Sequence, residues 1–232
     1  MSILTAPWRC LLTFGLLSAL MTLMIDSSAH AAGVVKVACV GASITAGAMI
    51  EPAQGNTYPD QLQALLGDNY EVGNLDHSYG HSGATVMKAG DHPYWNTPQF
   101  TSSTDFDADK YVILLGTNDT KTFNWAPHGS DFEGDYVALV KHYQGLPSHP
   151  TVYICLLPPI LHDGQYGMSS TNLENYVNPA IQRVAAETGA VLIDAHAPFL
   201  GHPEYFVEGV HPNAAGAKVL AETVYKAISG QK

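Results

Sequence analysis

The chain has 232 residues, which is enough for one sizeable α/β domain but few for two. Its 21 acidic and 10 basic residues give a formal net charge of −11 without any cluster of Lys or Arg, so nucleic acid and anionic membrane surfaces are not expected as partners. A hydrophobic content of 46% is typical of a folded globular protein.

The first 31 residues have the pattern of a cleavable signal peptide. Arg9 supplies a positive charge, residues 11–24 form an apolar stretch, and Ala29-His30-Ala31 matches a small-residue cleavage site. The apolar stretch is shorter than the roughly 20 residues of a spanning helix, which disfavours the alternative of a retained membrane anchor. We therefore predict cleavage after Ala31, one domain over residues 32–232, and a secreted or periplasmic protein with no stable membrane anchor.

Beyond residue 32, short β-rich runs alternate with helical patterns. The sequence predicts a strand at 34–40, a helix at 57–66, a strand at 70–75, a long surface excursion at 79–103, a strand at 110–115, a helix at 131–145, a strand at 151–157, a helix at 173–188, a strand at 190–193 and a helix at 213–228. Asn213 is the expected N-cap of the last helix. Continuous apolar strands separated by helices indicate a parallel sheet covered on both faces, which is an α/β fold.

Two cysteines remain after the predicted cleavage. Cys39 and Cys155 each lie inside an apolar, strand-like run, which favours free and buried thiols. A disulfide is the alternative, because export permits one. Residues on separate core strands need not be neighbours, however, so the free thiols are the favoured interpretation.

A serine and a histidine near opposite ends of the predicted domain indicate hydrolytic chemistry. Ser43 directly follows the first strand, and His211 lies in a Gly- and Pro-flanked loop before the last helix. A serine hydroxyl becomes a useful nucleophile when a base takes its proton, and a histidine oriented by a carboxylate is the usual base. The alternative for Ser43 is that it caps the following helix.

Two carboxylates compete to orient His211. Glu208 stands three residues before it, and Asp194 follows the fifth predicted strand. Either can accept the Nδ1–H of the imidazole and fix its tautomer. The remaining histidines show no compact ligand spacing, so we expect no metal site.

Asn118 and Gly83 are candidates for stabilising a negatively charged oxygen. Asn118 follows the strand at 110–115, and its side-chain NH₂ is a suitable donor to a developing oxyanion. Gly83 allows a backbone N–H to approach the same point. The alternative for both residues is an ordinary role in turns.

Taken in chain order, four blocks resemble the GDSL-type esterases, the SGNH hydrolase superfamily. The blocks are GASITAG at 41–47, HSGAT at 81–85, LGTND at 115–119 and the segment from Glu208 to His211. Stretches at 58–62, 90–95, 116–121, 201–204 and 209–216 resemble the secreted carbohydrate or sialate-type O-acetylesterases of that superfamily. The resemblance implies a three-layer α/β/α sandwich around a flavodoxin-like, five-stranded parallel sheet, with no bound cofactor.

The resemblance also assigns roles to residues of this chain. It makes Ser43 the nucleophile and His211 the base, with an oxyanion hole built from the backbone N–H groups of Ser43 and Gly83 and the side chain of Asn118. Ala42 and Glu208 stand where the family usually has Asp. Glu208 therefore either completes a Ser-His-Glu triad, the favoured interpretation, or points away and leaves a backbone carbonyl to orient His211.

The predicted activity is that of an exported serine esterase that removes small acyl groups, chiefly acetyl, from carbohydrate hydroxyls. The alternatives are a lipase or thioesterase for longer acyl chains and an inactive, carbohydrate-binding relative. Tyr94, Trp95 and Trp125 are the candidate substrate-binding residues, because aromatic rings stack on sugars. Their alternative role is packing in the core or in loops.

Overall fold

The structure is a computed structural model that describes residues 1–2, 33–73 and 78–230. The predicted signal peptide, apart from its first two residues, lies outside the described residues, and cleavage after Ala31 stays a prediction. The described part of residues 33–232 forms one compact unit. No helix in the described ranges is long and apolar enough to span a membrane.

A parallel sheet forms the centre of this unit. In the described ranges it has six strands: β1 (Val35–Gly41), β2 (Tyr70–Val72), β3 (Tyr79–Gly80), β4 (Lys110–Leu114), β5 (Thr151–Leu156) and β6 (Val191–Asp194). Their order is β2-β1-β4-β5-β6, and β3 also pairs with β1. The five longer strands thus have the flavodoxin-like order, with β1 beside the point where the strand order reverses.

The five predicted strands are confirmed, and burial accounts for the central ones, whereas most residues of β2 and β6 are not buried. Residues 37–41 of β1 and the last five residues of β5 are buried, as expected for parallel strands covered on both faces. The thiols of Cys39 and Cys155 lie in these strands and are free, which confirms the favoured interpretation of the two cysteines. Burial raises the pKa of the Cys39 thiol to about 12, so it behaves as a small apolar group.

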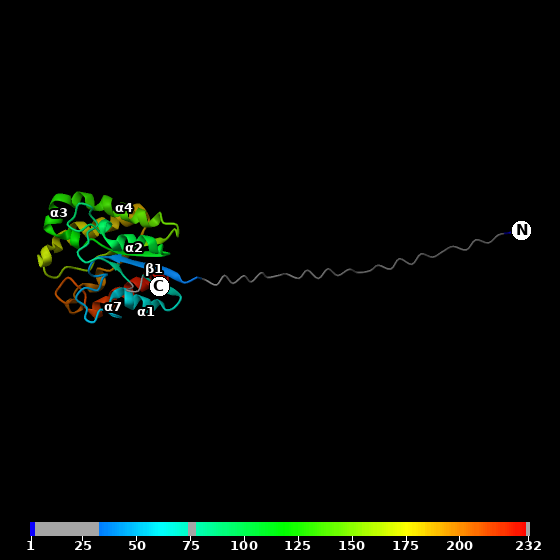
Figure 1. Cartoon of the computed structure of the whole chain (residues 1–232), viewed down its shortest axis with the longest axis horizontal. Helices are drawn as coiled ribbons and strands as arrows, with labels where there is room; N and C mark the ends of the chain where they lie inside the picture. The colour runs from blue at the N-terminus through cyan, green and yellow to red at the C-terminus, as the bar shows by residue number, and fades with distance from the viewer. Residues whose placement is uncertain (3–32, 74–77, 231–232) are drawn as a thin grey trace. The chain divides into compact units, whose positions relative to one another are not determined.

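Helices cover both faces of the sheet, as the pattern of alternating elements predicted. Figure 1 shows α1 (Tyr58–Leu66) and α7 (Ala214–Ser229) on one side of β1, and α2 (Pro98–Phe106), α3 (Thr122–His128) and α4 (Phe132–Gln144) on the other. The helix α6 (Asn178–Thr188) packs against α4. The remaining helical turns are α5 (Ser170–Asn172), the π-helical η5 (Leu173–Val177) and the 3₁₀ turns η1 (Tyr94–Asn96), η2 (Asn118–Thr120), η3 (Gly129–Asp131), η4 (Gln165–Gly167), η6 (Ala197–Phe199) and η7 (Pro203–Tyr205).

Local sequence accounts for where α1 and α7 begin. Thr57 and Asp60 form a reciprocal capping box at the start of α1, in which Thr57 Oγ1 accepts the Asp60 N–H and the Asp60 carboxylate accepts the Thr57 N–H. Asn213 Oδ1 accepts the N–H groups of Ala215 and Gly216 at 3.0 Å each, which confirms the predicted N-cap of α7. This cap places the loop that carries His211 directly before the helix.

The prediction of a surface excursion over residues 79–103 is wrong. The segment contains β3, η1 and most of α2, and Val86, Met87 and Tyr94 within it are fully buried. Its aromatic and aliphatic side chains have no helical or strand period, so their burial follows from contacts with distant elements. The segment therefore packs as part of the core beside the sheet.

Candidate active site

Ser43 and His211 meet at the carboxyl end of the sheet. Ser43 lies two residues beyond β1, and its Oγ is 2.9 Å from His211 Nε2 although the two residues are 168 positions apart. Both are largely buried, with 8% of each residue exposed. The distance permits direct transfer of the hydroxyl proton to the imidazole.

Glu208 takes the position behind His211. One carboxylate oxygen accepts the His211 Nδ1–H, and the other accepts the backbone N–H groups of Val210 at 3.1 Å and His211 at 2.9 Å. The longer side chain of Glu, relative to Asp, is therefore folded back over its own turn. Asp194, the competing carboxylate, instead accepts the backbone N–H groups of His196 and Ala197 and begins η6.

The carboxylate of Glu208 is held in its ionised form. Burial alone would raise the pKa of Glu208, but the hydrogen bonds from the His211 side chain and from the backbone N–H groups of His211 and Val210 outweigh that effect. The pKa of Glu208 consequently lies below its ordinary value. An ionised carboxylate in this place stabilises an imidazolium when His211 accepts a proton.

A pocket of about 350 Å³ opens beside Ser43 and His211. It is lined by Ser43, Ala48, Met49, Ser82, Gly83, Asn118, Lys121, Tyr166, Met168 and His211. A larger hollow of about 540 Å³ lies beside the start of α1 and contains none of the predicted catalytic or oxyanion residues. The side-chain chemistry, rather than the volume, therefore identifies the smaller pocket as the candidate site.

Within the described ranges, no group of three or more His, Cys, Asp or Glu side chains is arranged to hold a metal ion.

Gly83 and Asn118 face the same pocket from two different segments. The Asn118 side-chain NH₂ donates one hydrogen bond to Ala84 O at 3.1 Å, which orients the amide and leaves its second N–H for a ligand. Gly83 has a φ of 86°, a left-handed conformation that favours glycine. A side-chain donor and a glycine turn thus adjoin the same cavity.

A buried carboxylate joins the two segments. Asp119 accepts the backbone N–H of Val86 at 3.0 Å and that of Met87 at 2.8 Å, so the turn that carries Asn118 is tied to the segment after Gly83. Burial raises the pKa of Asp119 to about 7, and the two backbone N–H groups work against this rise. The relative position of Gly83 and Asn118 therefore depends on this carboxylate.

The three predicted substrate-binding aromatics do not line the pocket. Tyr94 is fully buried and its hydroxyl donates to Tyr79 O at 2.7 Å, so it has no face free for a sugar. Trp95 packs against the core and donates from Nε1 to Val86 O at 3.0 Å. Trp125 stacks on a neighbouring tyrosine and lines a separate hollow. Tyr94 and Trp95 thus pack in the way that stood as the alternative, and a substrate-binding role for Trp125 stays a prediction.

Several residues that line the pocket have no role predicted from the sequence, and Tyr166, Met49 and Met168 are the largest apolar ones. Tyr166 is 52% exposed and approaches the His211 ring edge-on, with ring centroids 5.7 Å apart. Met49 and Met168 supply the apolar lining. No local pattern marks these three, because each reaches the pocket from a turn or loop outside the strands and longer helices. Lys121 also lines the pocket, and its position three residues after Asn118 could have predicted this from the sequence.

The sheet order and the Ser-His-carboxylate arrangement at its edge have the form of a serine-type hydrolase. The chain belongs to the GDSL-like lipase/acylhydrolase family of carboxylic ester hydrolases, whose family model matches residues 39–219. An acetylxylan esterase from Xylanibacter ruminicola is 34% identical over 212 residues, a match that covers 84% of this chain and 43% of that protein. The chain thus spans less than half the length of that relative.

Solved structures share the fold. The crystal structure of the acetyl xylan esterase AlAXEase is 23% identical, with a TM-score of 0.64 over 84% of this chain and 100% of the other. A carbohydrate acetylesterase from Sinorhizobium meliloti is 18% identical, with a TM-score of 0.64 over 85% of this chain and 100% of the other. At these identities, the likeness shows a common three-layer α/β architecture.

Proposed function

We propose that this protein is a serine esterase that hydrolyses small acyl esters, chiefly acetyl esters, on carbohydrate hydroxyls. The observation that carries the proposal is the contact of 2.9 Å between Ser43 Oγ and His211 Nε2 at the wall of a pocket that also holds Asn118 and Gly83. The name of the relative from Xylanibacter ruminicola, acetylxylan esterase, supports acetyl as the acyl group and a sugar as the alcohol.

In the proposed reaction, Ser43 Oγ attacks the ester carbonyl carbon while its proton passes to His211 Nε2. The negative charge that develops on the carbonyl oxygen is held by the backbone N–H groups of Ser43 and Gly83 and by the Asn118 amide. The bond to the sugar oxygen then breaks, and the proton on His211 passes to that oxygen. Water attacks the acyl-enzyme and gives a proton to His211, and the return of that proton to Ser43 releases acetate.

The role proposed for Glu208 is to hold His211 in the tautomer that accepts a proton at Nε2. Its hydrogen bond to Nδ1 supports this role, as does the lowered pKa of its carboxylate. A charged carboxylate beside Nδ1 also lowers the free energy of the imidazolium formed during both halves of the reaction.

Acetate release from a panel of acetylated oligosaccharides tests the proposal, with Ser43→Ala as the matched inactive control. We expect release by the wild-type protein and none above background by the variant. Hydrolysis of octanoyl nitrophenyl ester in preference to the acetyl ester would instead indicate a lipase or thioesterase. Failure of a fluorophosphonate probe to label Ser43 in folded protein would indicate an inactive relative.

We also propose that the protein is exported. The support is the pattern of residues 1–31, with Arg9, the apolar stretch at 11–24 and a small-residue site that ends at Ala31. N-terminal sequencing of the protein recovered outside the cytoplasm should begin at Ala32. A mature protein that begins at Met1 would contradict cleavage.

A further inference from the structure

Among the residues that line the pocket, Lys121 is the one Lys or Arg. It follows directly after η2, the turn that carries Asn118, and only 12% of its side chain is exposed. A partly buried ammonium is expensive to leave without a partner, so a lysine at this place requires an anchoring group. The pocket itself provides none, because no carboxylate lines it in the described part of the chain.

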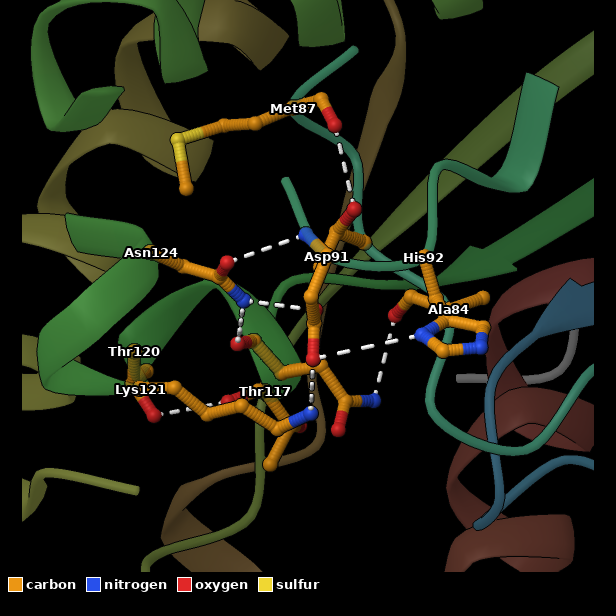
Figure 2. Close-up of polar contacts among 10 residues, drawn as sticks. Ala84, Met87, Asp91, His92, Thr117, Thr120, Lys121 and Asn124 are labelled. Atoms are coloured by element: carbon orange, nitrogen blue, oxygen red, sulfur yellow. Dashed lines mark hydrogen bonds and ion pairs between the residues drawn. The ribbon is translucent and has the colours of Figure 1, made fainter. Parts of the chain in front are cut away.

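Asp91 is the group that anchors this ammonium. Its Oδ2 lies 2.9 Å from Lys121 Nζ, and its Oδ1 accepts the side-chain NH₂ of Asn124 at 2.7 Å. Asn124 returns a bond, since its Oδ1 accepts the Asp91 backbone N–H at 3.0 Å. Figure 2 shows the contacts of the Asp91 carboxylate with the side chains of Lys121 and Asn124. Both carboxylate oxygens are therefore used, and Asn124 holds in place the carboxylate that receives Lys121 Nζ.

The anchored ammonium retains donors for a ligand. An ammonium has three N–H groups, and Asp91 Oδ2 is the one hydrogen-bond acceptor that the described residues offer to Lys121 Nζ. The Phe123 ring lies 5.6 Å from Nζ and accepts no conventional hydrogen bond. Ser82 and Asn118 add further donor groups to the same cavity. The wall beside the nucleophile is consequently rich in donors, and it suits a molecule rich in acceptor oxygens.

The charge of the pair narrows the class of alcohol. Asp91 neutralises Lys121, so a carboxylate on the substrate would gain the attraction of one and meet the repulsion of the other. A cationic alcohol would likewise meet the repulsion of Lys121 beside the attraction of Asp91, and no carboxylate lines the pocket to favour it. A neutral polyol gains hydrogen bonds and suffers neither repulsion. An unsubstituted aryl or alkyl alcohol offers no acceptor oxygen beyond the ester itself and leaves the ammonium without a further ligand.

We propose that Lys121 is a specificity-determining residue that donates hydrogen bonds to an oxygen of the alcohol part of the ester, and that Asp91 is its positioning residue. The inference rests on the proposed ester hydrolysis and deepens it. The preferred substrates are acetyl esters of neutral polyols with a free hydroxyl or ring oxygen near the ester, in preference to aryl or alkyl acetates.

Lys121→Met tests the inference because it keeps the apolar stem and removes the donors. With acetylated xylo-oligosaccharide we expect kcat/KM to fall by about 10- to 100-fold, the range for a hydrogen bond to a charged group, mostly through a higher KM. With phenyl acetate the change should stay within about threefold, because the phenyl group has no acceptor oxygen beyond the ester itself for Lys121. Lys141→Met, at an exposed lysine of α4 paired with Glu187, is the matched control and should change neither value.

Asp91→Asn and the double variant test the positioning role. Asp91→Asn should also raise KM for the oligosaccharide, by a smaller factor, since the donors remain but their direction is lost. The double variant should lose no more than Lys121→Met alone, because Asp91 acts through Lys121. Additive losses would overturn the positioning role of Asp91.

Equal losses of Lys121→Met on both substrates would overturn the inference, because they would indicate an effect on Asn118 or on the fold. No loss on either substrate would overturn it too.

Glycerol monoacetate separates this inference from the carbohydrate proposal. A wild-type protein that cleaves the glycerol ester but no acetylated sugar refutes the carbohydrate proposal, and Lys121 is then tested on the glycerol ester. A wild-type protein that rejects both polyol esters refutes both.

Discussion

Replacing Glu208 by Gln removes one charge from the site while nearly preserving the volume of the side chain. In the wild-type protein, one carboxylate oxygen accepts the His211 Nδ1–H and the other accepts two backbone N–H groups, from Val210 and His211. All of these partners are donors. A glutamine has only one acceptor oxygen, so it cannot satisfy both sides of this arrangement.

Either orientation of the new amide impairs the base. When the glutamine oxygen faces the backbone N–H groups, its NH₂ faces His211 Nδ1 and favours the tautomer with hydrogen on Nε2. That tautomer cannot accept the proton of Ser43. With its oxygen toward Nδ1, the NH₂ meets two backbone donors, and each donor left unsatisfied costs about 1–3 kcal/mol. Loss of the correct tautomer in a serine triad lowers turnover by about 10⁴. We expect kcat to fall about 10³- to 10⁴-fold, roughly 4–5.5 kcal/mol of activation free energy.

The assay is steady-state hydrolysis of 4-nitrophenyl acetate by the wild-type protein, Glu208→Gln and Glu208→Asp. Glu208→Asp keeps the charge and the two acceptors but draws the carboxylate back by one methylene, so we expect a loss of about tenfold. Thermal unfolding of each variant controls for loss of fold. A Glu208→Gln protein with an unchanged melting temperature and more than a tenth of wild-type turnover would refute the triad, and a backbone-oriented dyad would take its place.

Three further outcomes follow from the same contacts. Asn118→Ala should lower kcat by about 10²–10³ with little change in KM, and a loss below tenfold in folded protein would remove Asn118 from the oxyanion hole. Asp119 has a folded pKa raised from 3.8 to about 7, so its contribution to stability is complete below 3.8 and is lost as pH rises through 7. That difference in pKa corresponds to about 4 kcal/mol of unfolding free energy. Urea unfolding should show that this free energy falls less between these pH values in Asp119→Asn than in the wild-type protein. Identical slopes would contradict the burial argument. Thr57→Ala removes the capping box of α1 and should lower the unfolding free energy by about 1–2 kcal/mol. The control Thr101→Ala, at an exposed position of α2, should change it by less than about 0.5 kcal/mol. Equal effects would refute the role of the cap.

The positions of the five longer strands and the start of α7 could be predicted from local sequence. A run such as the one that ends at Gly41 is apolar because both faces of its strand are covered, and this requirement is visible without knowing the neighbours. Asn213 precedes a helical period and accepts two N–H groups of the first turn, a contact made within three residues. Such short-range relations are present in any window of the sequence.

Residues 79–103 show where local reasoning fails. The segment is irregular in pattern, yet Tyr94 is fully buried and Asp119 holds Val86 and Met87 from another part of the chain. Burial here is decided by contacts across more than 30 residues. Tyr94 and Trp95, two of the aromatics predicted to bind sugar, lie in or beside this core for the same reason, and the pocket instead contains Tyr166 from η4.

The sequence by itself determined the α/β class and the candidates for nucleophile, base and oxyanion donor, because strand burial, caps and short motifs are local properties. Only the tertiary structure decided the strand order, the meeting of Ser43 with His211 across 168 residues and the choice of Glu208 over Asp194. It also decided that Lys121 enters the pocket with Asp91 behind it. The physical reason is that these relations depend on which loops converge where the strands end, and convergence is a property of the packed sheet and its helices rather than of any one segment.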